Sequence, residues 1–143
     1  MALRWVWSAA LSALFAGLTA VFAKAGLGGV NADLATLLRT ALVLVFLTIV
    51  YTMLHGAPRV GALGIRAWLF LALSAAATAL SWLYYFRALQ AGPVAGVAAI
   101  DRASLLVAIV LSAAFLGEKL TLRTLGGTVL ITAGVLLITL RGR

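Results

Sequence analysis

The sequence contains no cysteine, a single histidine and only three carboxylates among its 143 residues. Without cysteine, the chain can form neither disulfides nor thiolate metal sites. One histidine and three carboxylates are also too few for a typical metal centre or hydrolytic site. Because no nucleophile–base pair or metal-ligand set is visible, the sequence predicts a protein that is not an enzyme and that needs no cofactor.

Charged residues are also scarce, at 10% of the chain, whereas hydrophobic residues make up 65%. Soluble domains are typically about half apolar and about a quarter charged, and a chain of this size could not bury so much apolar surface in its own core. We therefore predict an all-α integral membrane protein that contacts the lipid bilayer. The net charge of +8 comes from basic residues scattered between apolar runs, which is typical of the flanks of membrane spans and not of a nucleic-acid-binding surface.

Five uncharged runs divide the chain, over residues 5–23, 40–54, 67–86, 103–117 and 124–140. About 20 apolar residues are needed to cross a hydrocarbon core of about 30 Å. The second and fourth runs reach only about 22 Å as helices, so they must extend toward their N-termini to span the membrane. Asp33 is suited to cap the second helix and Pro93 suits the first turn of the fourth. The sequence thus predicts one domain over 1–143 with five transmembrane helices, at about 4–25, 33–54, 66–90, 94–116 and 122–140.

The two extensions place charged side chains inside the predicted membrane region. Arg39 lies about 9 Å into the helix over 33–54, and Asp101 lies about 10 Å into the helix over 94–116, next to Arg102. Lys24 and Arg87 lie near the ends of the first and third helices, so all five charges fall in the same half of the bilayer. A charge at membrane depth costs at least ~2.5 kcal/mol on insertion scales, and such groups usually face the bundle interior or a cavity.

Two interpretations of this charged cluster stay open. In the functional one, the cluster is a substrate or ion site in which Asp101 couples a proton or cation and the basic side chains hold an anionic group. In the structural one, Asp101 pairs with Arg39 or Arg87, while Lys24 and Arg102 extend to the lipid headgroups.

Hydroxyl and aromatic side chains gather on the helix over 66–90. Ser74, Thr78, Ser81 and Tyr85 recur at helical spacing, and Trp82 and Tyr84 lie near the same end. They predict either the wall of a translocation path or interhelical hydrogen bonds with an interfacial aromatic belt. With Ser104 from the helix over 94–116, the candidate substrate and coupling residues are Asp101, Arg39, Arg87, Lys24, Arg102, Tyr84, Tyr85, Ser81 and Ser104.

Gly127 and Gly134 are seven residues apart and therefore share one face of the helix over 122–140. Small residues let membrane helices approach closely where burial from water gives no driving force. This face is a candidate dimer seam, with packing inside one chain as the alternative.

The distribution of basic residues gives a weak orientation signal. The side of the N-terminus carries five of them: Arg4, Arg59, Arg66, Lys119 and Arg123. The opposite side carries six, of which the first four lie within predicted helices: Lys24, Arg39, Arg87, Arg102, Arg141 and Arg143. Counting loops alone favours a cytoplasmic N-terminus, in a multi-pass protein of the cell inner (plasma) membrane. Insertion in both orientations is the alternative.

Several short motifs resemble the EamA-type proteins of the drug/metabolite transporter superfamily. "FLGEKLT" followed by "GGTVLITAGVLLI" is similar to the family's junction between its fourth and fifth helices. Short, single-repeat members share four further motifs, which here are Phe22–Lys24, Arg39–Thr40, Tyr85–Leu89 and Ile100–Ser104. The resemblance covers almost the whole chain.

The resemblance implies that this chain is one repeat of an inverted-repeat transporter. Longer relatives carry two five-helix repeats in opposite orientations, and the related four-helix multidrug exporters are antiparallel dimers. A homodimer is therefore expected, antiparallel in preference to parallel, and the glycine face over Gly127 and Gly134 resembles the dimer seam of the small relatives. One departure is that the helix over 4–25 lacks the glutamate of those exporters, so export of polyaromatic cations by their mechanism is not expected. A second is that many two-repeat members have a proline where this chain has Asp101 and Arg102, so the site residues of those members are not carried over.

The function predicted on these grounds is secondary transport of a small metabolite or drug-like solute by a homodimer, through alternating access and with proton coupling by Asp101. One alternative is a translocase for an anionic lipid or lipid-linked headgroup, because the cluster is positive and lies off the midplane. The other is a non-transporting small subunit of a membrane complex.

Overall fold

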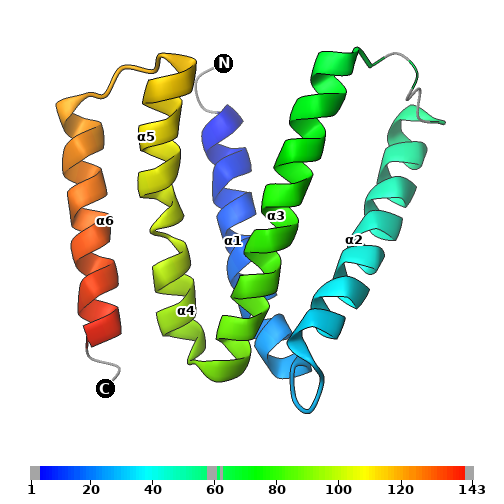
Figure 1. Cartoon of the computed structure of the whole chain (residues 1–143), viewed down its shortest axis with the longest axis horizontal. Coiled ribbons are helices and arrows are strands. Elements are labelled where there is room, and N and C mark those ends of the chain that lie inside the picture. Colours follow the sequence, from blue (N-terminus) through cyan, green and yellow to red (C-terminus); the bar gives the residue numbers. More distant parts are fainter. Residues whose placement is uncertain (1–3, 58–60, 62, 141–143) are drawn as a thin grey trace. The chain divides into compact units, whose positions relative to one another are not determined.

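The computed structural model describes residues 4–57, 61 and 63–140, and the ordered elements in this part of the chain are helices (Figure 1). The basic residues Arg59, Arg141 and Arg143 of the orientation count lie outside the described residues, as does the side chain of Arg4. The helices are α1 (Arg4–Gly26), α2 (Ala32–His55), α3 (Ile65–Ala91), α4 (Val94–Asp101), α5 (Ser104–Leu116) and α6 (Leu122–Leu140).

Five of the helical segments are long and apolar enough to cross a membrane, with α4 and α5 together forming one of them, Val94–Leu116. This confirms the predicted all-α architecture of five membrane spans. The N-terminal extension inferred from span length is also confirmed, because α2 begins at Ala32 and α4 at Val94. Arg39 and Asp101 therefore lie inside spans, as the length argument requires.

The fourth span differs from the continuous helix predicted over 94–116, because it is interrupted after Asp101. The N–H of Arg102 donates to the carbonyls of both Ala98 and Ala99, at 3.3 and 3.1 Å, and the N–H of Ala103 donates to Ile100 at 2.9 Å. Hydrogen bonds to the third preceding residue tighten the backbone into a 3₁₀-type turn. No glycine or proline marks this position, so the sequence pattern gave no sign of the interruption.

Helix capping corrects a second prediction. Asn31, and not Asp33, caps α2, because its Oδ1 accepts hydrogen bonds from the N–H groups of Asp33 at 2.8 Å and Leu34 at 3.1 Å. At the end of the fourth span, Gly117 adopts a left-handed conformation with φ 69°, which glycine tolerates without a Cβ clash. Thr121 caps α6 by accepting from the N–H of Thr124.

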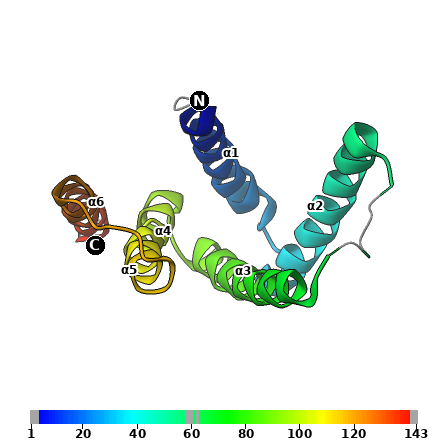
Figure 2. The same cartoon turned by 90° about the horizontal axis from the view of Figure 1, so that it is seen from above.

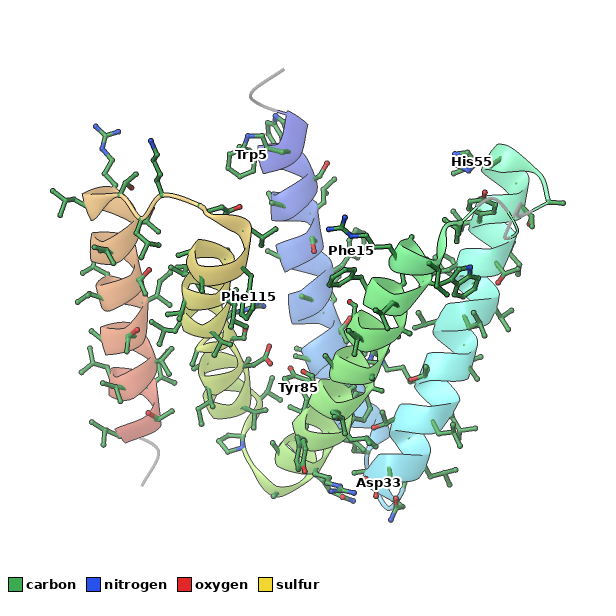
Figure 3. The ribbon with its side chains drawn as sticks, turned by 45° about the horizontal axis from the view of Figure 1, so that its top comes forward. Trp5, Phe15, Asp33, His55, Tyr85 and Phe115 are labelled. Carbon is green, nitrogen blue, oxygen red and sulfur yellow. The ribbon has the colours of Figure 1, made fainter. Side chains whose placement is uncertain are left out.

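The chain divides into two compact units, Ala23–Gln90 and the combination of Met1–Phe22 with Ala91–Arg143. In the second of these units, α4 packs against α6. The first contains α2 and α3, which lie closest at the Asp33 end of α2 and diverge toward the end that carries His55 (Figures 2 and 3).

The side chains that pack α2 against α3 are concentrated at the end where the helices meet. The described residues of this unit with exposed fractions of 5% or less are Leu27, Ala32, Thr36, Phe86 and Leu89. Elsewhere the apolar side chains of the spans are largely exposed within the chain, for example Phe46 at 65% and Leu73 at 58%. A surface this apolar is suited to lipid or to another protein chain, and not to water.

Candidate functional site

Three side-chain contacts fix the end of α3 within the unit of residues 23–90. Arg87 forms a bidentate pair with Asp33, with Nε to Oδ1 at 2.7 Å and a terminal nitrogen to Oδ2 at 2.8 Å. The ammonium of Lys24 donates to the carbonyl oxygen of Leu89, and the amide of Gln90 donates to the Val30 carbonyl at 3.0 Å. The last turn of α3 is thereby bound to the end of α1, to the following loop and to the first turn of α2.

These contacts change the structural interpretation of the charged cluster. Arg87 is bound by Asp33, whereas the structural interpretation of the sequence offered Asp101 as its partner. Lys24 has a partner inside the protein at the C-terminal end of α3, where a cation is favoured by the free carbonyls. Asp33 is the only carboxylate in the sequence between residues 23 and 90, but these bounds became known only from the fold.

Arg39 is held by aromatic side chains of α3. Its guanidinium carbon lies 4.4 Å from the centre of the Trp82 ring and 5.5 Å from that of Phe86. Such cation–π contacts contribute about 0.5–2 kcal/mol, more when water is excluded. The side chain is half-buried and lies about 10 Å from the start of α2, so Arg39 carries its charge into the apolar span.

The charges of this unit do not cancel. Asp33 is its single carboxylate, and both of its oxygens are occupied by Arg87. No carboxylate within residues 23–90 is therefore left to neutralise Arg39. A charge at membrane depth costs at least ~2.5 kcal/mol, which the stacking on Trp82 and Phe86 offsets only in part.

A cleft of about 580 Å³ lies between the diverging helices α2 and α3. This volume is within the range of about 300–1,000 Å³ typical of small-molecule sites. From α2 it is lined by Asp33, Thr36, Leu37 and Thr40. From α3 it is lined by Leu71, Ser74, Ala75, Thr78, Ala79, Trp82 and Leu83.

The threonine hydroxyls of the cleft already donate their hydrogens to the helix backbone. Thr36 donates to the carbonyl of Ala32 at 2.8 Å, and Thr40 to that of Thr36 at 2.7 Å. On α3, Thr78 donates to the carbonyl of Ser74 at 2.9 Å. Toward the cleft, these hydroxyl oxygens can therefore accept hydrogen bonds but not donate them.

The other candidates on α3 lie around this cleft without lining it. Ser81 is exposed and Tyr85 is half-buried, with the Tyr85 ring centre 6.4 Å from that of Phe86. The ring of Tyr84 lies 5.8 Å from the guanidinium carbon of Arg87. Sequence reasoning missed Thr36 and Thr40, although their spacing of four residues, with Asp33 three residues before Thr36, places all three on one helix face.

Asp101, Arg102 and Ser104 belong to the other unit and surround the interruption between α4 and α5. All three side chains are exposed within the chain. The N–H of Leu105 donates to the carbonyl of Arg102 at 3.1 Å. Among the described residues, neither Ser104 nor Leu105 donates its N–H to the carbonyl of Asp101. The carboxylate of Asp101 thus lies at a point where the regular helical hydrogen bonding of the span is broken.

The predicted glycine face lies on α6. At Gly127 and Gly134, an added Cβ would meet no atom within 4 Å. Close packing inside this chain therefore does not require glycine at either position. Among the described residues, no group of three or more His, Cys, Asp and Glu side chains could hold a metal ion.

Comparisons with known proteins agree with the membrane architecture. The model of a family described as "EamA-like transporter family" matches residues 3–140. A protein of Sinorhizobium sp., described as "Uncharacterized transporter in cobO 3′region", is 44% identical over 138 residues, which are 96% of this chain and 98% of that protein. No solved structure matches the chain significantly.

Proposed function

The chain belongs to the EamA-like transporter family, and on this premise we propose that it is a secondary transporter whose solute binds in the cleft between α2 and α3. The solute is a small metabolite or drug-like molecule, and the multi-pass protein resides in the cell inner membrane. Membership of a transporter family favours this function over that of a non-transporting subunit.

The observation that carries the proposal is the cleft itself. It combines a volume of about 580 Å³ with apolar side chains, an aromatic ring and hydroxyl oxygens. Ligand sites in proteins have this composition, in which apolar walls supply affinity and a few polar groups supply orientation. The threonine hydroxyl oxygens of α2 and α3 would accept hydrogen bonds from the solute.

A homodimer completes the proposed transporter. Alternating access in inverted-repeat transporters uses two halves that move against one another around the site, and this chain supplies one five-span half. The face of α6 with Gly127 and Gly134 is the proposed contact, since both glycines are open to a second helix. An antiparallel pair generates the required inversion directly.

Asp101 is the proposed proton-coupling group of this transporter. Ionisable residues inside membrane spans commonly form proton relays or ion pathways. Interrupted spans are also frequent at such sites, because free backbone groups are tolerated only where they line a cavity. The position of Asp101 at the break between α4 and α5 supports this role.

Filling the cleft tests the proposal. Ala79 lines it, so Ala79→Trp should occupy much of the space for solute, whereas Ala77→Trp places the same bulk on the same helix about 200° around the axis. A panel of small metabolites and drug-like compounds is screened for thermal stabilisation of the purified protein. We expect compounds that stabilise the wild type and Ala77→Trp to lose this effect in Ala79→Trp.

Retention of the stabilisation in Ala79→Trp would exclude the cleft as the solute site. Uptake of the stabilising compounds into proteoliposomes then separates binding from transport. Uptake by Ala77→Trp but not by Ala79→Trp supports the proposed function, and uptake by neither wild type nor control contradicts it.

A further inference from the structure

We infer that the solute of the cleft is an organic oxyanion, an apolar body bearing a carboxylate or phosphate group, and that Arg39 recognises its charge. This inference rests on the proposed function, because it names the substrate class of the same site. It follows from the geometry of Arg39, from the charge balance around it and from the chemistry of the cleft walls.

Arg39 contacts aromatic rings of α3 and has a guanidinium suited to oxyanions. The guanidinium carbon lies 4.4 Å from the Trp82 ring centre and 5.5 Å from that of Phe86. The five N–H donors of a guanidinium lie in its plane and point outward around its edge. Their forked arrangement matches the two oxygens of a carboxylate or phosphate, which is why arginine recognises these groups.

No carboxylate of this unit is left to pair with Arg39. Arg87 already uses both oxygens of Asp33, and residues 23–90 contain no second carboxylate. A bound oxyanion would neutralise Arg39 within the membrane span, where an isolated charge is unfavourable.

Trp82 connects this charge to the cleft, because its ring supports Arg39 and also lines the cavity. The apolar body of the solute would lie against Leu37, Leu71 and Trp82. The threonine hydroxyls cannot supply donors for an anionic group, since their hydrogens are held by backbone carbonyls. Asp33 also lines the cleft, but its charge is paired with Arg87. Arg39 contacts the lining residue Trp82, and we assign it to the anionic end of the solute.

The test uses three probes that share a phenyl ring and differ in charge. Phenylacetate is anionic at neutral pH, phenylacetamide is neutral and phenethylammonium is cationic. Their binding to the purified protein is measured by calorimetry at concentrations up to the millimolar range. We expect phenylacetate to bind most tightly, and a preference for the cation or the amide, or no binding of phenylacetate, would overturn the inference.

Variants of Arg39 test whether this residue binds the anionic group of the probe. Arg39→Gln should weaken phenylacetate binding about 10- to 100-fold, since a hydrogen bond to a charged group is lost, and leave phenylacetamide binding unchanged. Arg39→Lys should retain part of the affinity, because it keeps the charge without the planar fork. Arg66→Gln, at the other end of α3, is the matched control and should bind phenylacetate like the wild type.

Equal losses for phenylacetate and phenylacetamide in both Arg39 variants would show a structural role and overturn the inference. Ala79→Trp could abolish binding of the probes while Arg39→Gln leaves the order of their affinities unchanged. In that case the cleft is the solute site but the inferred charge recognition is wrong. The failures of the two proposals are thereby distinguishable.

The same oxyanion chemistry can come from a free solute or from a lipid headgroup. Vesicles that contain fluorescent phosphatidylglycerol separate these sources. Uptake of radiolabelled phenylacetate that depends on Arg39 assigns the site to a free carboxylate, and Arg39-dependent movement of the lipid between leaflets assigns it to a headgroup phosphate. The inference fails if neither process depends on Arg39.

Discussion

The bidentate pair of Asp33 and Arg87 joins the first turn of α2 to the last turns of α3, and its side chains are 46% and 52% exposed. We expect Asp33→Asn and Arg87→Gln each to lower the melting temperature of the purified protein by a few degrees. The double variant should lower it no further than the more affected single one, because both substitutions break the same contact. Additive losses in thermal unfolding would show that the two side chains stabilise the protein independently.

Asp101 is the residue on which proton coupling depends in the proposed transporter. Asp101→Asn keeps nearly the same shape and removes the titratable proton, so the variant should fold and dimerise like the wild type. We expect uptake driven by a proton gradient into proteoliposomes to fall to the level of empty vesicles. Glu118→Asn, in the loop after α5, is the control and should keep its uptake. Gradient-driven uptake by Asp101→Asn would refute the coupling role.

At the scale of elements, the interruption between α4 and α5 is expected to be a weak point of the fourth span. Its N–H groups donate to the third preceding residue, with poorer geometry than in a regular helix. In lipid nanodiscs, the amides of residues 103–106 should therefore exchange with deuterium at least about tenfold faster than those of residues 76–79, in the middle of α3. Equal protection of the two segments would show that the interruption does not loosen the span.

The five spans were predictable from the sequence because the length of a membrane helix is set by the bilayer. Short apolar runs had to extend, and α2 accordingly begins at Ala32 with Arg39 inside the span. The break after Asp101 was not predictable, since the residues around it carry no helix-breaking signal. The sequence pattern also did not show which of two neighbouring polar side chains caps α2. Asn31 is the cap, which leaves the carboxylate of Asp33 to bind Arg87.

The candidate site was predictable in its residue types and less so in its partners. Span length placed Arg39 in the membrane, and helical spacing identified Ser74 and Thr78, which line the cleft. Sequence spacing within one helix cannot reveal which helix lies opposite. The stacking of Arg39 on Trp82 and the contribution of Thr36 and Thr40 therefore emerged only from the fold.

At the scale of the whole molecule, dimerisation through α6 requires small residues at Gly127 and Gly134. Leucine at both Gly127 and Gly134 would hold the two helix backbones apart, while improving the helix propensity of α6. We expect this double variant to weaken the dimer about tenfold or more, measured by energy transfer between labelled chains as the protein is diluted in lipid. The matched control carries leucine at Gly126 and Ala133, about 100° around the same helix.

The glycine seam would be excluded if the control pair weakened the dimer as much as the seam pair. It would also be excluded if leucine at Gly127 and Gly134 left energy transfer unchanged. Since both pairs are seven residues apart and replace small residues by leucine, differences between them report the position of the face and not the added bulk.

The last prediction concerns the orientation of the two copies. The basic residues divide nearly evenly between the two sides, so the sequence provides little bias toward a single insertion. An antiparallel dimer needs chains in both orientations, and a single cysteine at Lys119 in an otherwise cysteine-free protein reports them. We expect an impermeant maleimide to label about half of Lys119→Cys in intact cells and the remainder only after permeabilisation. Gly28→Cys, in the loop between α1 and α2 on the opposite side of the membrane, should also be labelled in about half of the chains before permeabilisation.

A parallel dimer with a cytoplasmic N-terminus gives a different pattern, in which Lys119→Cys is protected in intact cells and Gly28→Cys is fully labelled. Adding arginines beside Lys119 tests whether both orientations are needed, because positive charge retains a loop in the cytoplasm. If both orientations are required for function, this change should leave the chains inserted one way and abolish uptake. Co-expression of a second variant with arginines beside Gly28 should then restore uptake, since the two variants together supply an antiparallel pair.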